Sequence, residues 1–272
     1  MINQYFLKQI GMKISKSNQK YLISLIDKKL IWAIIPARVG SLRVKNKNLQ
    51  KINNIELYLY SLGLSKKIKS INSTFISTNC LKIANQSLRY GGICPFLRPN
   101  KISGKNSTDT SYISHFINNI INTYEKLPNL IIQLRPTTPF RNVAIIENAI
   151  SKFMKNYKKY DSLRSSNLIS HPPEKIYRIK NNKYVNINLK KLNTEYSNKP
   201  AQYFKPTYKP NGYIDIIKTE YFIKNTKIYG DNIMPFITPE PIEIDTYSDL
   251  QRAKTDNSVE KKKIIKIINK YA

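Results

Sequence analysis

The chain has 272 residues, with 46 Lys and Arg against 17 Asp and Glu and with 41% hydrophobic residues. This length suffices for one large domain or two small ones, and the hydrophobic fraction is too high for a disordered basic tail. The two cysteines and two histidines lack zinc-ligand spacing, which excludes a disulfide framework and a structural zinc site and favours a reducing, cytoplasmic setting. No apolar run approaches the roughly 20 residues that cross a bilayer, so no membrane partner is predicted.

The formal net charge of +29 suggests at first a nucleic-acid partner, because basic surfaces attract polyphosphates. The lysines, however, are spread along the whole chain together with abundant Asn, Ile and Tyr, which AT-rich codons favour. Such a compositional bias produces the same excess without the clustered basic stripe of a nucleic-acid binder. We therefore predict no specific nucleic-acid partner, while a non-catalytic basic binding protein stays an alternative.

Predicted strands and helices alternate along the first 160 residues. Residues 1–30 form a basic N-terminal extension in which a short amphipathic helix is expected. The apolar run at 31–37 is typical of a strand buried on both faces. Further strands are expected at 73–77, 93–97 and 130–134, and helices near 56–67, 80–90 and 110–126. Repeated units of this kind predict an α/β fold with a mostly parallel sheet covered by helices on both faces.

The pattern changes past residue 160. Residues 161–165 favour another strand, but 166–210 is rich in Asn, Lys, Tyr and Pro and is interpreted as an irregular excursion. Strands are expected again at 213–217 and 241–245, followed by a helix that begins near Thr246 or Ser248. The basic segment 257–272 is predicted to form an exposed or dimer-contacting helix.

Three loops after predicted strands carry groups capable of chemistry, and in open α/β sheets ligands bind at the carboxyl ends of strands. The first loop, 38–48, is dense in cations and hydrogen-bond donors but lacks P-loop spacing. It is either a cradle for a triphosphate or a solvated basic loop. Its polar members are Arg38, Ser41, Arg43, Lys45, Lys47 and Asn48, together with the backbone of Gly40.

The second loop, 135–141, contains two prolines that restrict its backbone. The hydroxyl groups of Thr137 and Thr138 and the guanidinium groups of Arg135 and Arg141 then project from a rigid turn. The alternative is a turn that only starts the helix near Val143, and the two interpretations are compatible.

The third loop contains Glu243 and Asp245. Alternation with period two places both carboxylates on one face of the expected strand. Two carboxylates that face a phosphate site are what a bridging Mg²⁺ requires. The alternative is that Asp245 only caps the next helix.

Seven short motifs occur in one order between residues 31 and 255, and together they resemble the acylneuraminate cytidylyltransferase family, the synthetases of CMP-sialic acid and related CMP-nonulosonic acids. The motifs are Ile34-Ile35-Pro36-Ala37-Arg38-x-Gly40-Ser41-x-Arg43 with Lys47-Asn48, Phe75-Ile76-Ser77-Thr78, Pro95-Phe96-Leu97-Arg98-Pro99, Leu134-Arg135-Pro136-Thr137-Thr138-Pro139-x-Arg141, His171-Pro172-Pro173-Glu174-Lys175, Pro210-Asn211-Gly212-Tyr213 and Ile244-Asp245-Thr246.

The resemblance implies a nucleotide-diphospho-sugar transferase fold over residues 31–256, with 166–210 as a dimerisation subdomain and a basic C-terminal helix at 257–272. It also implies a homodimer, a Mg²⁺ cofactor and a reaction. In that reaction the anomeric hydroxyl of an acidic nine-carbon sugar attacks the α-phosphorus of CTP and releases pyrophosphate.

Roles follow from the resemblance motif by motif. The nucleotide phosphates would be held by Arg38, Ser41, Arg43, Lys47 and Asn48, while Ser77 and Arg98 would lie near cytosine. The sugar would be bordered by Arg135, Thr137, Thr138 and Asn211, and Lys175 would pair with its carboxylate. Glu243 and Asp245 would bind the metal. The residues expected to act in catalysis are Arg38, Arg43, Lys47, Asn48 and Asp245.

The chain also departs from the family pattern. Leu42 stands where the family usually has Lys, and Arg135 and Glu243 stand where Gln and Asp are frequent. A nucleotidyltransferase of the same fold that acts on another sugar acid or on a sugar 1-phosphate is therefore a second enzymatic alternative.

Overall fold

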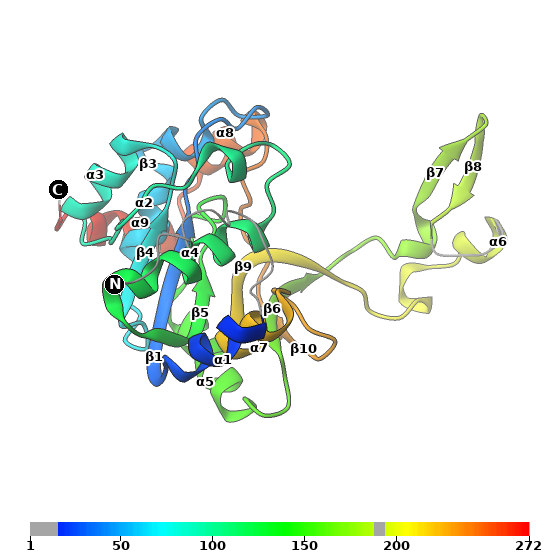
Figure 1. The fold of residues 1–272 in the computed structure, drawn as a ribbon. Helices are drawn as coiled ribbons and strands as arrows, with labels where there is room; N and C mark the ends of the chain where they lie inside the picture. Colours follow the sequence, from blue (N-terminus) through cyan, green and yellow to red (C-terminus); the bar gives the residue numbers. More distant parts are fainter. Residues whose placement is uncertain (1–15, 188–193, 272) are drawn as a thin grey trace.

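The computed structural model describes residues 16–187 and 194–271. Figure 1 shows a layered α/β body and an arm that extends from it. The strands are β1 (Ile26–Pro36), β2 (Lys51–Ile52), β3 (Ile55–Glu56), β4 (Ser73–Ser77), β5 (Leu127–Gln133), β6 (Ser162–Leu168), β7 (Tyr177–Lys180), β8 (Lys183–Asn186), β9 (Tyr208–Lys218) and β10 (Ile233–Ile237). The α-helices are α1 (Lys16–Ser24), α2 (Leu57–Ser65), α3 (Leu81–Arg89), α4 (Asp109–Tyr124), α5 (Val143–Lys155), α6 (Thr194–Ser197), α7 (Thr219–Asn225), α8 (Tyr247–Thr255) and α9 (Val259–Ile268).

The central sheet has six strands in the order β10-β6-β9-β5-β1-β4. Strand β1 runs parallel to both β4 and β5, and β10 runs parallel to β6. Strand β9 is antiparallel to its neighbours β5 and β6. The predicted α/β fold with a mostly parallel sheet is confirmed.

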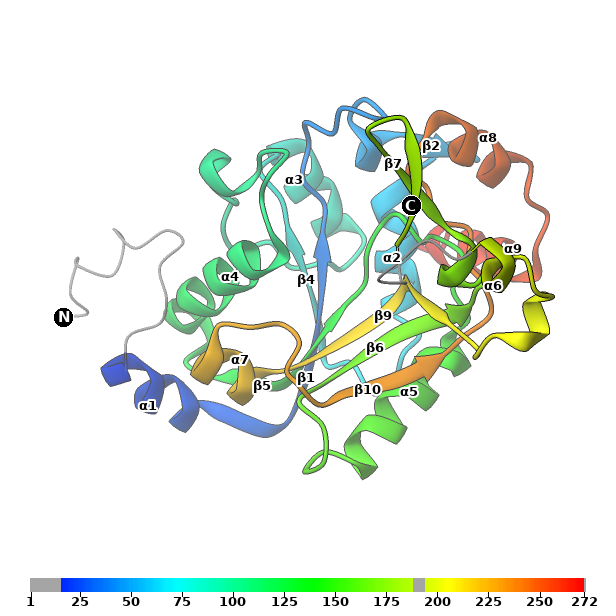
Figure 2. The same ribbon diagram turned by 90° about the vertical axis from the view of Figure 1, so that its right-hand side faces the viewer.

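Side chains of β1 alternate between two hydrophobic cores, one on each face of the sheet. Ala33 and Ile35 belong to the core beneath α2, α5 and α9, whereas Trp32 and Ile34 belong to the core beneath α1, α4 and α7. This arrangement explains why the run at 31–37 is continuously apolar, because both of its faces are covered. In Figure 2 the helices flank the sheet on its two sides.

Several predicted elements differ from the structure. Strand β1 starts at Ile26, so the boundary at residue 30 falls inside it, and the expected helix of the N-terminal extension is α1, whose Leu22 is buried. No strand forms at 93–97, where only Ile93 bridges to β4, because Pro95 and Pro99 lack the N–H groups that a ladder needs. Residues 241–245 lie outside the sheet, and the strand of the central sheet that was missed is β10. The strands of the two small sheets, β2-β3 and β7-β8, were not predicted either.

The basic C-terminal helix does not stand free. Helix α9 packs against α2, and Ile264 and Ile268 are buried in the core. A Cβ atom on Gly63 of α2 would lie 2.6 Å from Ile268, so the two helices approach closely. The expectation of an exposed or dimer-contacting helix is therefore wrong for this face of α9.

The excursion after β6 forms an arm, defined here as residues 169–207. Its described part contains the two-stranded sheet β7-β8 and the short helix α6. In Figure 1 the tip of the arm lies well away from the sheet and its helices. No helix within residues 16–187 and 194–271 has both the length and the apolar character that crossing a bilayer requires.

Candidate functional site

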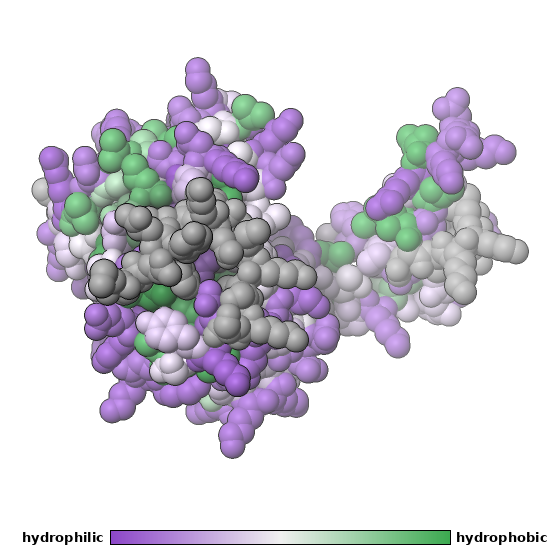
Figure 3. Space-filling view, in the orientation of Figure 1, coloured by the Kyte–Doolittle hydropathy of each residue, from purple (hydrophilic) through white to green (hydrophobic). Residues whose placement is uncertain are grey.

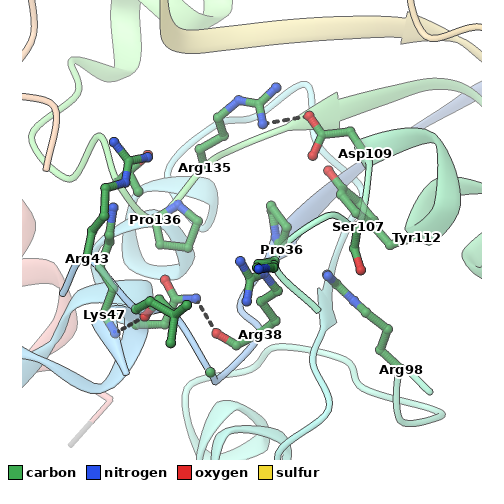
Figure 4. Close-up of a pocket in the computed structure, with 16 residues that line it drawn as sticks. Pro36, Arg38, Arg43, Lys47, Arg98, Ser107, Asp109, Tyr112, Arg135 and Pro136 are labelled. Atoms are coloured by element: carbon green, nitrogen blue, oxygen red, sulfur yellow. Dashed lines mark hydrogen bonds and ion pairs between the residues drawn. The ribbon is translucent and has the colours of Figure 1, made fainter. Parts of the chain in front are cut away.

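A polar pocket of about 400 Å³ lies at the carboxyl ends of β1, β4 and β5. The parallel strands deliver their following loops to the same edge of the sheet, as expected for this fold class. Figure 4 shows that the side chains of Arg38, Arg98 and Arg135 come from different segments around one space. The lining residues are Pro36, Arg38, Gly40, Ser41, Leu42, Arg43, Lys47, Asn48, Arg98, Lys105, Ser107, Asp109, Tyr112, Arg135, Pro136 and Thr137.

The loop at 38–48 is held in shape by its own polar groups. The Ser41 hydroxyl donates to the Val44 carbonyl at 2.7 Å and accepts from the Lys47 backbone N–H at 2.6 Å. The Asn48 amide donates to the carbonyl of Arg38 at 2.8 Å. Ser41 and Asn48 therefore build the loop as well as line the pocket, which fixes where its cations lie.

Lys47 connects this loop to the acidic segment near residue 245. Its ammonium group donates to the Asp245 carboxylate at 2.8 Å and to the Ile244 carbonyl at 2.7 Å, and its side chain is only 10% exposed. The guanidinium of Arg43 lies 3.5 Å from the same carboxylate. The structure thus brings together the first and third of the predicted loops.

Asp245 does not cap the helix that follows it. The cap of α8 is Thr246, which forms a reciprocal capping box with Asp249. The Asp249 carboxylate also accepts from the backbone N–H of Asp245. The carboxylate of Asp245 is consequently left for Lys47 and Arg43.

Arg98 is buried beside the end of β4. Its guanidinium donates to the Ser77 hydroxyl at 3.0 Å and to the Ser77 carbonyl at 2.8 Å, and it lies 4.5 Å from the ring centre of Tyr112. Burial lowers the pKa of Arg98 to about 10. Arg98, which lines the pocket, is thus held in place by Ser77.

Arg135 is bonded to two carboxylates that the sequence analysis did not identify. Its guanidinium lies 2.7 Å from Asp109 and 3.0 Å from Asp215. Burial alone lowers the pKa of Arg135, but these two carboxylates outweigh burial and hold the pKa above its ordinary value. The sequence contains one indication of the pairing with Asp215. This residue is charged but lies inside the apolar strand 213–217, and a buried charge needs a partner of opposite charge.

The second loop is fixed by a buried arginine. Arg141 is 1% exposed, and burial lowers its pKa to about 9. It donates to the carbonyls of Tyr213, Arg135 and Gly212. This arginine ties the loop at 135–141 to β9 and does not project from the turn, so the expectation for Arg141 is wrong, because its guanidinium is taken up by backbone carbonyls. The expected helix does begin at Val143, with Asn142 as its cap.

Thr137, Thr138 and Asn211 lie near the junction of the second and third loops. The Thr137 carbonyl accepts from the Ile244 N–H at 2.8 Å. Thr138 is buried, and its hydroxyl has no hydrogen-bond partner among the described residues. Asn211 is buried on β9, where its amide donates to the Thr238 hydroxyl at 2.8 Å.

Glu243 and Asp245 line a second polar pocket of about 270 Å³ with Asn211 and Asp249. Burial and then the neighbouring charge of Asp245 raise the pKa of Glu243. No group of three or more His, Cys, Asp or Glu side chains with metal-binding geometry occurs in the described part of the chain. Two carboxylates that line one polar pocket are nevertheless a donor set for a divalent cation, because such an ion can take one or two protein carboxylates and complete its shell with phosphates and water.

Among the predicted site residues, Ser77, Thr138 and Lys175 line neither pocket. Ser77 bonds to the lining residue Arg98, and Thr138 follows the lining residue Thr137, whereas Lys175 lies elsewhere. It belongs to the arm, where its ammonium lies 5.7 Å from the ring centre of Phe204. The first pocket also has four polar lining residues that no sequence motif indicated, namely Lys105, Ser107, Asp109 and Tyr112.

The sequence profile of the family described as cytidylyltransferase matches residues 32–264. Among curated relatives, the post-translational flagellin modification protein B of Campylobacter coli is 28% identical, over 81% of this chain and 91% of its own length. The CMP-N,N′-diacetyllegionaminic acid synthase of Legionella pneumophila is 27% identical, over 80% and 92%. The pseudaminic acid cytidylyltransferase of Campylobacter jejuni is 23% identical, over 81% and 93%.

Solved structures agree on the fold. A CMP:2-keto-3-deoxy-manno-octonic acid synthetase complexed with CTP superposes with a TM-score of 0.60 at 14% identity, covering 83% of this chain and 97% of that one. A 4-diphosphocytidyl-2C-methyl-D-erythritol synthase gives 0.58 at 7% identity, covering 84% and 97%. Because the family profile spans most of the sequence, the chain belongs to the cytidylyltransferase family of nucleotidyltransferase enzymes.

Proposed function

We propose that this protein transfers CMP from CTP to the anomeric hydroxyl of a sialic-acid-like nonulosonic acid. The hydroxyl oxygen forms a bond to the α-phosphorus while the bond from that phosphorus to the β-phosphate bridging oxygen breaks. Pyrophosphate leaves with the electron pair, and the hydroxyl proton passes to solvent. The observation that carries the proposal is the convergence of the loops 38–48, 135–141 and 243–245 around adjoining polar pockets.

The cationic side of the pocket is suited to a triphosphate. Arg38, Arg43 and Lys47 supply positive charge from one loop whose backbone is fixed by Ser41 and Asn48. Preorganised cations stabilise the charge that develops on phosphate oxygens without reorganising during the reaction. Ser77 and Arg98 are proposed to border the cytosine, and Arg135, Thr137, Thr138 and Asn211 the sugar.

Glu243 and Asp245 are the residues proposed to hold Mg²⁺. When bound, the ion would neutralise part of the triphosphate charge and assist departure of pyrophosphate. Lys47, which bonds to Asp245, would then position that carboxylate relative to the phosphates.

The arm is proposed to contact a second copy of the chain. Its described part exposes apolar side chains, with Ile179 at 72% and Tyr184 at 64%, and Figure 3 shows green hydrophobic patches on it. Apolar surface on a projection that its own body does not cover favours an interface, and a homodimer is the commonest assembly. In such a dimer Lys175 of one copy would approach the sugar in the pocket of the other.

A panel of four nucleoside triphosphates with and without sugar tests the reaction. We expect pyrophosphate release only with CTP, Mg²⁺ and one of N,N′-diacetyllegionaminic acid, pseudaminic acid or N-acetylneuraminic acid. Release with a sugar 1-phosphate, or with another nucleotide in preference to CTP, would contradict the proposal. Sequence-selective RNA binding without any turnover would favour a non-catalytic basic protein instead.

A further inference from the structure

The two carboxylates bonded to Arg135 differ in how deeply they are buried. Asp215 is 3% exposed on β9, where it pairs in register with Gln133 of β5. The amide oxygen of Gln133 also accepts from the guanidinium of Arg135, at 3.3 Å. The side of Arg135 that faces the sheet is therefore fixed by groups that no ligand reaches.

Asp109 lies on the other side of Arg135, against the open pocket. Its side chain is 33% exposed and lines the pocket, and its carboxylate is 2.7 Å from the guanidinium. Figure 4 shows the two side chains meeting at the pocket wall. Although Asp109 begins α4, the cap of that helix is the side chain of Thr108, which accepts from the Ser111 N–H.

Exchange of one carboxylate for another at Arg135 leaves the charge around this arginine unchanged. A phosphate would bring more negative charge to a guanidinium that already faces Asp215, and a neutral group would not compensate for displacing Asp109. The planar guanidinium matches carboxylate geometry, and such charge-assisted hydrogen bonds are among the strong ones. The open side of Arg135 therefore favours an acid.

We propose that Arg135 binds the carboxylate of the acidic sugar and that Asp109 occupies this position until the sugar displaces it. The inference rests on the proposed function and adds to it a residue that determines specificity. Arg135 makes the site selective for an acid over a neutral sugar, and Asp109 keeps Arg135 from binding phosphate until the sugar arrives. Asp215 stays bonded throughout and preserves the orientation of the guanidinium.

Substrate discrimination tests this role of Arg135. The wild-type chain is given the sugar acid that it turns over and the C1 methyl ester of that acid, and kcat/KM is compared. We expect a preference for the acid of roughly 10- to 100-fold, as for one charge-assisted interaction. In Arg135→Gln the preference should fall roughly tenfold with the KM for CTP unchanged, and what remains would come from Lys175 of a second copy. In the control Lys105→Met, which removes another cation of the same pocket, the preference should persist.

Asp109→Asn supplies a second, independent measurement. The variant should keep the preference for the acid, lower the KM for the sugar and become more sensitive to competition by inorganic phosphate. If the KM for the sugar and the inhibition by phosphate are both unchanged, the proposed displacement of Asp109 by the sugar is overturned. Because Asp109 is partly exposed and is not the helix cap, this variant is expected to fold.

Folding is controlled by measuring CTP affinity in each variant. Arg135→Gln leaves the buried Asp215 without its closest cation and can therefore destabilise the fold. Arg135→Lys keeps a positive charge there, and its preference for the acid over the ester should lie between those of the wild type and Arg135→Gln. If the wild type releases pyrophosphate with the acid and both Arg135 variants keep its full preference, only this inference fails. If the wild type releases none with any acidic sugar, the proposed function itself fails.

Discussion

The ammonium group of Lys47 lies 2.8 Å from the carboxylate of Asp245, although 198 residues separate them in sequence. The bond joins the loop that follows β1 to the segment that precedes α8, and Arg43 approaches the same carboxylate. Because the Lys47 side chain is nearly buried, its bond to Asp245 fixes where the positive charge of Lys47 lies in the pocket.

Asp245→Asn should lower turnover roughly 100-fold or more, because a metal that neutralises phosphate charge contributes several kcal/mol to the transition state. The expected loss is accompanied by weaker dependence on Mg²⁺ concentration, measured by pyrophosphate release. Glu240→Gln is the matched control, since Glu240 also lines the second polar pocket but is exposed and bonds to Lys209. Full turnover in the Asp245 variant would reject the metal assignment.

Glu243→Gln should stabilise the metal-free protein at neutral pH. Burial and the charge of Asp245 raise the pKa of Glu243 in the folded state, so its ionised form costs stability at pH values above that pKa. The gain should disappear as the pH falls and Glu243 becomes protonated in both folded and unfolded states. Thermal melts from pH 4 to pH 8 measure this difference, and added Mg²⁺ should stabilise the wild type more than the variant. A variant that is less stable at neutral pH without metal would contradict this account.

Gly212→Ala should cost about 1–3 kcal/mol of unfolding free energy and reduce activity. Gly212 has φ +62°, and an added Cβ would lie 3.3 Å from the Thr138 hydroxyl and 3.4 Å from the Arg135 side chain. Both the left-handed backbone and the close approach oppose a side chain. Gly104→Ala is the control, because no atom of residues 16–187 or 194–271 lies within 4 Å of its added Cβ. Equal denaturation midpoints for the two variants would disprove the constraint.

Mixing two inactive variants should restore activity if the arm serves a second copy. Lys175→Met keeps an intact pocket, and Asp245→Asn keeps an intact arm. A mixed dimer then contains one complete site, so recovery should approach about a quarter of wild-type activity for random exchange. Pyrophosphate release after mixing measures the recovery.

The assembly is tested separately by sedimentation. Ile179→Ser should favour the monomer, because the exposed side chain of Ile179 is proposed to be covered by the second copy. Arg178→Ser is the control on the same strand. A wild-type chain that sediments as a monomer would contradict the proposed dimer.

The sequence predicts the body of the fold because its strands are short apolar runs between turn signals. β4 is recovered over its full length, at 73–77. β10 is not predicted because Pro235 interrupts its pattern. A proline is tolerated there since β10 is an edge strand.

Residues 243–245 show the predicted alternation of buried and partly exposed side chains, but residues 241–245 do not form the predicted strand. Ile244 is buried and Glu243 and Asp245 are partly exposed, as alternation predicts. Instead of a strand ladder, however, the segment has one backbone–backbone bond among the described residues, from the Ile244 N–H to Thr137, and side-chain bonds from Lys47. The pairing of Arg135 with Asp109 was not predictable, since the contact depends on how α4 packs beside β5. Local patterns indicate which face a side chain occupies, whereas long-range partners follow from the packing of whole elements.

A crystal structure of the protein with CTP tests the central claim most directly, through the distances from the triphosphate oxygens to Lys47 and Arg43. The account predicts hydrogen-bond distances to these cations, with the cytosine beside Arg98. A nucleotide whose phosphates lie away from residues 38–48 would contradict it.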